Sequence, residues 1–311
     1  MANGIGPWEN APQLTMIAAS QQGGSRGAQL WGLGIDYQIT SIYQVTPGGS
    51  WSKWEGPDWA GPGGPALFVD LTAAQQNDGR VALWALDDRQ QLWCIWQTSP
   101  GGNWSAWSGP NWNKATTLRE ICACQQGGSR GAQLWAIDQN DNLVTCYQVT
   151  PGGDWSGWAP WPATPANSTF TQLAAAQQND GRVQLWAIDS YLQLWSTWQT
   201  SPGGDWTGWS GPNWDNAPKL FNVAASQQGG NRGAQLWAIT EDYTLISDFQ
   251  VTPGGGWSGW SKGSWAGAPG VIQIAAAQQN NGNVEFWAIT NDGVLIGISQ
   301  TSPGGDWSGW S

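Results

Sequence analysis

A short tryptophan phrase, read as SPGGDWTGW over residues 201–209, occurs in six similar copies along the chain. The first tryptophans of these copies are Trp51, Trp104, Trp155, Trp206, Trp257 and Trp307. Subtraction of these numbers gives steps of 53, 51, 51, 51 and 50 residues. Repeats of about 40–50 residues with several short strands each are typical of β-propellers. The repeat runs through all 311 residues, so we expect one closed domain.

The fourth repeat shows how one blade is built. Residues 171–177, 182–188, 192–198 and 205–209 have the composition of short strands, and Gly-rich or Pro-Gly turns separate them. Three tight hairpins followed by one long connector, residues 211–218, describe a four-stranded meander and a crossover. The sequence therefore predicts an all-β, six-bladed β-propeller of four-stranded antiparallel blades. The approximate blades are Leu14–Trp54, Phe68–Trp107, Arg119–Trp158, Phe170–Trp209, Phe221–Trp260 and Ile272–Trp310.

Three packing expectations follow from this order. The alanines of the first strand suit the crowded axis, and the second-strand tryptophans such as Trp186 suit the blade interior. Trp206 and Trp209 are three apart, so a regular strand would turn them to opposite faces, toward different blades. The N-terminal residues 6–12 resemble a connector and are expected to provide the link after the sixth blade, without strand exchange.

A second period is superimposed on the first. Odd repeats carry QQGGSRG or a close variant from Gln21, Gln125 and Gln227, while even repeats carry QQN(D/N)G from Gln75, Gln177 and Gln278. The duplicated unit is thus about two blades, which predicts pseudo-threefold symmetry and two alternating sets of three binding sites.

Composition excludes several classes of function. The net charge is −11 and basic residues are not clustered, so neither a nucleic acid nor an anionic membrane surface is an expected partner. Histidine is absent, which excludes a Ser-His-Asp or Cys-His triad. Cys94, Cys122, Cys124 and Cys146 fit no zinc spacing and are expected to be largely buried free thiols, with a chance disulfide as the alternative. We expect no metal and no cofactor.

The N-terminal residues do not have the pattern of a signal peptide. The first ten residues lack the basic and apolar regions of a signal peptide, and no run of 18 apolar residues is present. We therefore expect cytoplasmic synthesis, with any release following a route that needs no signal peptide.

Two groups of residues are candidates for ligand contact, one at each end of the ring. Loop tryptophans offer an apolar face and a polar edge, which suits a sugar ring; the competing role is that each closes the seam between blades. These connector tryptophans are Trp8, Trp59, Trp112, Trp161, Trp214 and Trp265. At the other end, arginines of the first turn either hold that turn or contact a ligand. These arginines are Arg26, Arg80, Arg130, Arg182 and Arg232, and the sixth repeat has Asn283 where the even repeats have arginine.

Two stretches of the fourth repeat, DGRVQLWAI from Asp180 and WQTSPGGDWTGW from Trp198, resemble the Photorhabdus-type (PLL-like) β-propeller lectins. The resemblance extends over all six repeats and implies recognition of fucose and O-methylated sugars in pockets between blades. Members of that family have seven blades, whereas six repeats are present here.

The leading hypothesis is a multivalent lectin without enzymatic activity, whose partners are cell-surface glycans or glycoconjugates; homo-oligomerisation is left open. A glycosidase or sialidase needs a carboxylate pair at one privileged site, which symmetric repeats do not favour. A third hypothesis is a protein-interaction scaffold, and a fourth is an engineered or recently amplified chain without an evolved ligand.

Overall fold

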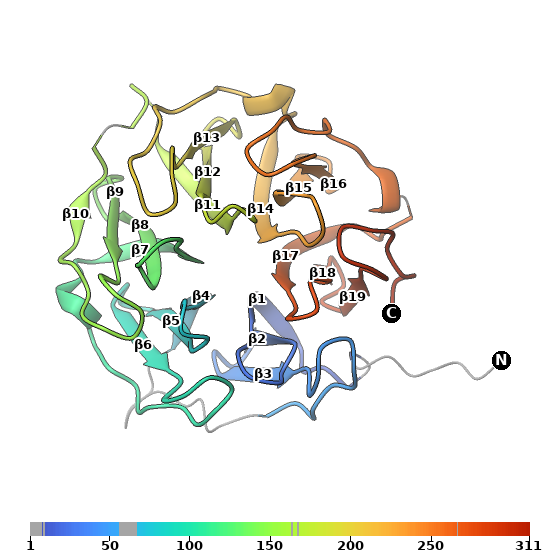
Figure 1. Cartoon of the computed structure of the whole chain (residues 1–311), viewed down its shortest axis with the longest axis horizontal. Helices are drawn as coiled ribbons and strands as arrows, with labels where there is room; N and C mark the ends of the chain where they lie inside the picture. The colour runs from blue at the N-terminus through green and yellow to red at the C-terminus, as the bar shows by residue number, and fades with distance from the viewer. Residues whose placement is uncertain (1–7, 9, 56–66, 163, 167, 266) are drawn as a thin grey trace.

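The computed structural model describes residues 8, 10–55, 67–162, 164–166, 168–265 and 267–311. Six antiparallel sheets form a ring around a central axis, as Figure 1 shows. Each sheet is built from one continuous stretch of chain, and the sheets follow one another in sequence order. The six-bladed β-propeller predicted from the repeat is therefore confirmed, and we number its blades one to six.

The strands of the six blades, in chain order, are as follows. They are β1 (Leu14–Gln21), β2 (Ala28–Gly34) and β3 (Ile39–Tyr43); β4 (Phe68–Gln75), β5 (Val81–Asp87) and β6 (Leu92–Trp96); β7 (Leu118–Gln125), β8 (Ala132–Asp138), β9 (Leu143–Tyr147) and β10 (Ala159–Pro160); β11 (Phe170–Gln177), β12 (Val183–Asp189) and β13 (Leu194–Trp198); β14 (Leu220–Gln227), β15 (Ala234–Thr240) and β16 (Leu245–Phe249); and β17 (Val271–Gln278), β18 (Val284–Thr290) and β19 (Leu295–Ser299). Short 3-10 turns lie in the connectors at Trp112–Lys114, Trp214–Asn216 and Gly263–Trp265.

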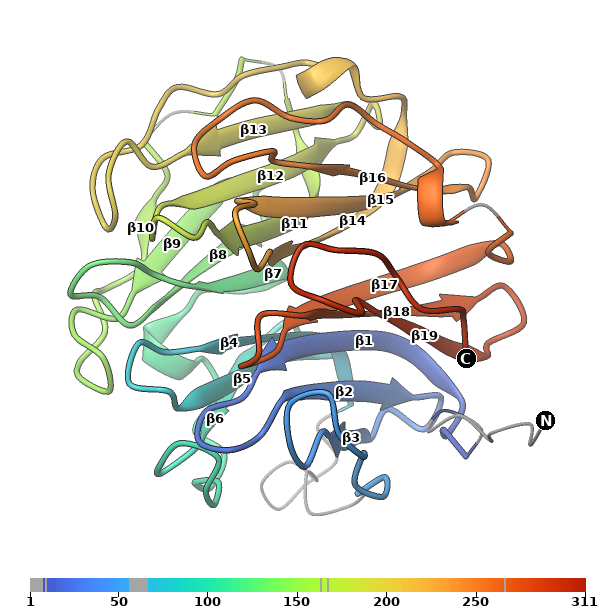
Figure 2. The same cartoon turned by 45° about the vertical axis from the view of Figure 1, so that its right-hand side comes forward.

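The first strand of every blade lies next to the axis. Each of these strands contacts its counterparts in the two neighbouring blades, and β1 contacts both β4 and β17, which closes the ring (Figures 1 and 2). Small residues such as Ala73 and Ala175 line part of the axial space, where the first strands of all six blades converge. The alanine-rich sequence of these strands thus fits the crowding at the centre.

The second strand of every blade forms its interior. All seven residues of each such strand are buried, which is expected when both faces of a sheet are covered by neighbours. Its tryptophan has an exposed fraction of 0% in every blade. These six residues are Trp31, Trp84, Trp135, Trp186, Trp237 and Trp287.

The fourth strand is weaker than the sequence predicted. In blade four it is reduced to two isolated bridges, Gln199 with Trp206 and Ser196 with Ser210. Blades one, two and five have the same two bridges, and the glutamine–tryptophan bridge recurs in blades three and six. Within the described residues, β10 of blade three is the one segment regular enough to count as a fourth strand. Between the two bridges of blade four, the two residues 197–198 of the third strand face the three residues 207–209 of the outer segment, which bulges outward at the exposed Gly208.

The seam between two successive blades is filled by indole rings. In the seam between blades four and five, Trp186 lies 5.7 Å from Trp257 and Trp214 lies 4.8 Å from Trp257, with ring planes nearly perpendicular. Edge-to-face contacts of this kind add to the energy gained by burial. Trp257 and Trp260 both pack in this same seam. The prediction that paired tryptophans pack toward different blades is therefore wrong, because the bulged outer segment does not alternate like a regular strand.

The first described residue completes the ring. Trp8 packs between Trp287 of blade six and Trp51 of blade one, with a ring separation of 5.1 Å from Trp51, and its Nε1 donates to Ser311 Oγ at 3.2 Å. Trp8 thus takes the position of a connector tryptophan after blade six, as expected, while residues 6, 7 and 9 of that segment lie outside the described residues. The four cysteines are buried and free, which was also expected.

Candidate functional site

Two neighbouring seams are hollow near the rim of the ring. The seam between blades three and four holds a cavity of about 750 Å³, and the seam between blades two and three holds one of about 190 Å³. The two cavities have equivalent walls. The larger is lined by Arg130, Tyr147, Trp161 and Trp206, and the smaller by Arg80, Trp96, Trp112 and Trp155. A concave site with an arginine and three aromatic rings therefore occurs in both of these seams.

Each wall of this site comes from a different element. In the larger cavity, Arg130 lies at the end of the first turn of blade three, and Tyr147 is the last residue of β9. Trp206 follows the turn at residues 201–204 of blade four, in which Pro202 and the positive φ of Gly203 (66°) meet the needs of a type II turn. Trp161 comes from the connector between the two blades. The site therefore exists only where two complete blades meet.

We call the seams that follow blades one, three and five the odd seams. At each odd seam, an arginine guanidinium lies over the aromatic ring that ends the third strand. The Cζ atom is 4.0 Å from the ring centre of Tyr43 for Arg26, 4.1 Å from that of Tyr147 for Arg130 and 4.0 Å from that of Phe249 for Arg232. Within the described part of the chain, none of the three forms an ion pair within 4 Å. The guanidinium of each is thus held by contact with the ring and not by a close carboxylate.

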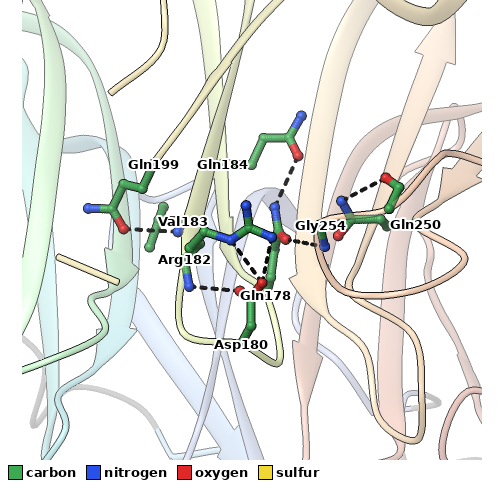
Figure 3. A network of polar contacts seen from close by, with 9 residues as sticks. Gln178, Asp180, Arg182, Val183, Gln184, Gln199, Gln250 and Gly254 are labelled. Carbon is green, nitrogen blue, oxygen red and sulfur yellow. Dashed lines mark hydrogen bonds and ion pairs between the residues drawn. The ribbon is translucent and has the colours of Figure 1, made fainter. Parts of the chain in front are cut away.

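We call the seams that follow blades two, four and six the even seams. There the arginine is held by an acid from its own turn: Arg182 Nη2 lies 2.6 Å and Nε 2.8 Å from Asp180 Oδ2 (Figure 3). Arg80 and Asp78 repeat this geometry. The same guanidinium crosses the seam, because a methyl group added at Gly254 of blade five would lie 1.7 Å from Arg182 Nη2. The Gly254 amide in turn donates to Gln178 Oε1 at 2.9 Å.

The even seam between blades six and one departs from the others. Asn283 replaces the arginine, as the sequence showed, and Ser299 replaces the aromatic residue that ends the third strand. Glu285 is buried where blades one, three, four and five have glutamine, and it accepts a hydrogen bond from Gln279 Nε2 at 2.7 Å. Burial raises the pKa of Glu285 to about 8. This seam therefore lacks the arginine and aromatic pair found in the other five.

The connector tryptophans divide into two groups. Trp112 and Trp161 are half-buried and line the two seam cavities, in contact with the arginine side of the same seam. Trp8, Trp214 and Trp265 are only 6%, 8% and 4% exposed, so their ring faces are covered within the seam clusters. Trp59 lies outside the described residues. The connector tryptophans and the first-turn arginines were predicted to lie at opposite ends of the ring, but Trp112 and Trp161 line the same cavities as Arg80 and Arg130. Ligand contact by any of these residues stays a prediction.

Sequence reasoning missed two contributions to the cavity walls. The aromatic residue that ends the third strand was read as part of the strand alone, and Trp155 and Trp206 were assigned to packing. A signal was available for the first, because Tyr, Trp or Phe precedes the glutamine at this point in five of the six repeats. For Trp206 the two roles coincide: it packs on Trp135 at 5.7 Å and also lines the cavity.

The acids with strongly raised pKa values lie away from the two cavities. Asp70 and Glu120 line the axial channel, where burial raises the pKa of Asp70 to about 7 and that of Glu120 well above its ordinary range. Asp205 lines the larger cavity as a single carboxylate, whereas glycoside hydrolysis uses a pair.

The described residues show neither a metal-binding cluster nor a membrane-spanning helix. These residues hold no cluster of three or more His, Cys, Asp or Glu side chains that suits a metal ion. None of their helices has the length and apolar character needed to cross a membrane.

No protein-family model and no curated protein matches the sequence. Solved structures are similar over nearly the whole chain. The BP39L lectin from Burkholderia pseudomallei is 22% identical with a TM-score of 0.64, covering 94% of this chain and 82% of its own. AofleA from Arthrobotrys oligospora is 15% identical with a TM-score of 0.70, covering 98% and 88%.

The fucose-specific lectin from Aleuria aurantia is 14% identical with a TM-score of 0.66 and 96% coverage of both chains. A further solved structure, with a TM-score of 0.68, is described as a six-bladed β-propeller with fucose recognition. At these identities the likeness concerns the fold and does not single out the Photorhabdus-type lectins. The chain therefore has the six-bladed β-propeller fold that these lectins share.

Proposed function

We propose that this protein is a multivalent, non-catalytic carbohydrate-binding protein that recognises fucose-type sugars in the seams between its blades. The observation that carries the proposal is the repeated rim arrangement, in which an arginine, an aromatic residue at the end of the third strand and the first tryptophan of the next blade surround one cavity. The fold supports the proposal but does not by itself assign a ligand.

The chemistry of this arrangement suits a neutral sugar. The aromatic rings present broad apolar faces to the C–H side of a pyranose, and a 6-deoxy sugar such as fucose adds a methyl group to that side. The guanidinium offers several N–H donors in a fixed plane to the hydroxyl oxygens on the polar side. O-methylated sugars fit the same division into an apolar and a polar side, and we include them in the proposal.

The structural neighbours agree with this chemistry. One is described as specific for fucose, and the SapL1 lectin was solved with α-methyl fucoside. One solved form of AofleA carries three arginine-to-alanine changes. These descriptions concern the neighbours, and their sites come to this chain only as part of the proposal.

The ring geometry suits binding to a glycan-coated surface. Several weak sites on one rigid body engage neighbouring glycans at a high effective concentration, so avidity exceeds the affinity of any single site by roughly 10²–10⁴. Five seams carry the arginine, and they alternate between the odd and even geometries described above.

The two arginine sets test the proposal by isothermal titration with methyl α-L-fucoside. Changing Arg26, Arg130 and Arg232 to alanine is expected to remove the odd sites, and changing Arg80 and Arg182 to alanine is expected to remove the even ones. Loss of a charge-assisted hydrogen bond costs about 1.5–3 kcal/mol, which weakens each affected site roughly ten- to hundredfold. The number of sites that titrate should fall accordingly.

The matched control is Arg89→Ala, which removes an exposed arginine from a turn at the opposite end of blade two. This variant should bind like the unaltered protein. An O-methylated fucoside and a glycan array, run on the same variants, test the wider specificity. Unchanged fucoside binding after both sets of arginine changes, or binding to no glycan at all, would contradict the proposal.

A further inference from the structure

The seam between blades three and four has much more room than the next seam. Its cavity measures about 750 Å³, against about 190 Å³ between blades two and three, although the arginine, aromatic and tryptophan walls are equivalent. Sites for drug-sized ligands commonly measure about 300–1,000 Å³. The larger cavity falls inside this range and the smaller one below it, so the two seams differ in the size of ligand that they can enclose.

The extra room comes from the connector that follows blade three. After blade two, the 3-10 turn at Trp112–Lys114 carries Asn113 across the seam, where its Nδ2 donates to Ser156 O of blade three at 2.9 Å. After blade three, Ala159–Pro160 instead continues the sheet as β10, paired with Thr145 and Val144. Among the described residues of this connector, none bonds the outer segment of blade four in the way that Asn113 bonds blade three.

The added volume has a different chemistry from the shared part. Arg130 and Tyr147 form the polar and aromatic wall that the smaller cavity also has, in Arg80 and Trp96. Pro160 and Pro165 line the larger cavity alone and extend the apolar surface of Trp161, whose counterpart Trp112 also lines the smaller cavity. Proline fixes its own backbone angle, so this apolar surface loses little conformational entropy when a ligand settles against it.

We propose that the seam between blades three and four binds a disaccharide, whereas the smaller seam between blades two and three binds a single sugar ring. The terminal fucose-type ring lies at the Arg130 and Tyr147 end, as in the other sites. The second ring lies with its apolar face along Pro160, Trp161 and Pro165. This inference rests on the proposed function for its first ring and adds one extended site to the ring.

The test compares methyl α-L-fucoside with the disaccharide Fucα1-6GlcNAc by isothermal titration on the complete chain. The monosaccharide should not single out the seam between blades three and four from the other seams. The disaccharide should show one site per chain that is about tenfold tighter than the remainder, because the large cavity of that seam encloses its second ring.

Gly208 allows this site to be blocked without disturbing its arginine. It is exposed, it lines the large cavity, and a methyl group added there meets no atom within 4 Å. Gly208→Trp should abolish the tight disaccharide site and leave the weak class in place. The matched control is Gly157→Trp, at the equivalent position of blade three. An added methyl group is also unhindered there, and Gly157 does not line the small cavity.

The outcomes separate the two proposals. Equal affinity of all sites for both sugars, or a tight site that persists in Gly208→Trp, overturns the extended site while monosaccharide binding upholds the proposed function. Loss of the tight site in Gly157→Trp as well would also overturn it, since the effect would not be local. Binding of neither sugar overturns the proposed function and this inference together.

Discussion

The odd and even seams share one core and differ at the rim. In both classes a fully buried tryptophan of one blade meets a tryptophan of the next, at 5.7 Å for Trp135 with Trp206 and 5.7 Å for Trp186 with Trp257. At the rim, the odd seams place an unpaired arginine over an aromatic ring, while two of the even seams tie the arginine to an aspartate. The core fixes how blades pack, and this leaves the rim able to differ between seams.

The first turns of two successive blades meet across each seam, and these contacts differ in the same alternating way. In the odd seam after blade three, Gly127 lies so close to Gly181 that an added methyl group would be 2.0 Å from the Gly181 oxygen. In the even seam after blade four, Asn179 bridges the gap, and its Oδ1 accepts from Gln227 Nε2 at 2.7 Å. The odd seam is thus closed by close backbone packing between the two turns, and the even seam by side-chain hydrogen bonds.

The largest expected effect tests whether the two cores are equivalent. Trp135→Ala and Trp186→Ala each remove a ring that is 0% exposed, one from an odd seam and one from an even seam. Each change should lower the free energy of unfolding by about 3–5 kcal/mol, because a large cavity replaces the ring. Chemical denaturation monitored by circular dichroism measures the cost. A much smaller loss for one variant would show that the two cores are not equivalent.

The next effect concerns the divergent seam between blades six and one. Because burial raises the pKa of Glu285 from an ordinary 4.5 to about 8, the folded state holds its proton more tightly than the unfolded state does. The stability that this group contributes is therefore present at pH 4.5 and below and is lost as the pH rises toward 8. Glu285→Gln, which cannot ionise, should be more stable than the unaltered protein by about 2–4 kcal/mol at pH 9, and close to it at pH 5.

Thermal unfolding at pH 5, 7 and 9 measures this difference. Glu55→Gln, at an exposed carboxylate of blade one, is the matched control and should leave the pH profile unchanged. Glutamine is already present at the same strand position in blades one, three, four and five, so the variant is expected to fold. A parallel loss of stability with pH in Glu285→Gln would show that another group is responsible.

The smallest effect compares the two ways of closing the rim. Gly127→Ala should cost about 1–3 kcal/mol, because the added methyl group meets backbone that cannot move aside easily. Asn179→Ala removes hydrogen bonds at an exposed turn and should cost about 1 kcal/mol. Denaturation midpoints of the two variants decide the order. If Asn179→Ala cost more, the hydrogen-bonded closure would be the stronger one.

Much of the fold was readable from the sequence because the repeat is regular. Six copies of one phrase gave the number of blades, and the odd and even turn motifs gave the alternation seen in the seams. The outer strand was misjudged because Trp206 and Trp209 look like strand residues, yet the segment between them bulges at Gly208. Local sequence does not show such a bulge, since it depends on how the third strand beside it is paired.

Only some residues of the candidate site could be predicted from the sequence, because the site depends on contacts between segments that are distant in the chain. Arg130 and Trp161 were picked out as members of two different ends of the ring, and the structure brings both to one cavity. Tyr147 was not picked out, because its role depends on the guanidinium that lies over it. Which connector tryptophans face a cavity and which are covered also depends on the packing of the next blade.

The sequence by itself determined the architecture, because a period of about 51 residues with small residues in one strand and tryptophan in the next allows little besides a ring of similar blades. Only the tertiary structure decided where that ring is hollow. The difference between 190 and 750 Å³ arises where connector, turn and strand of two blades meet, and contacts between distant segments leave no periodic trace in the chain.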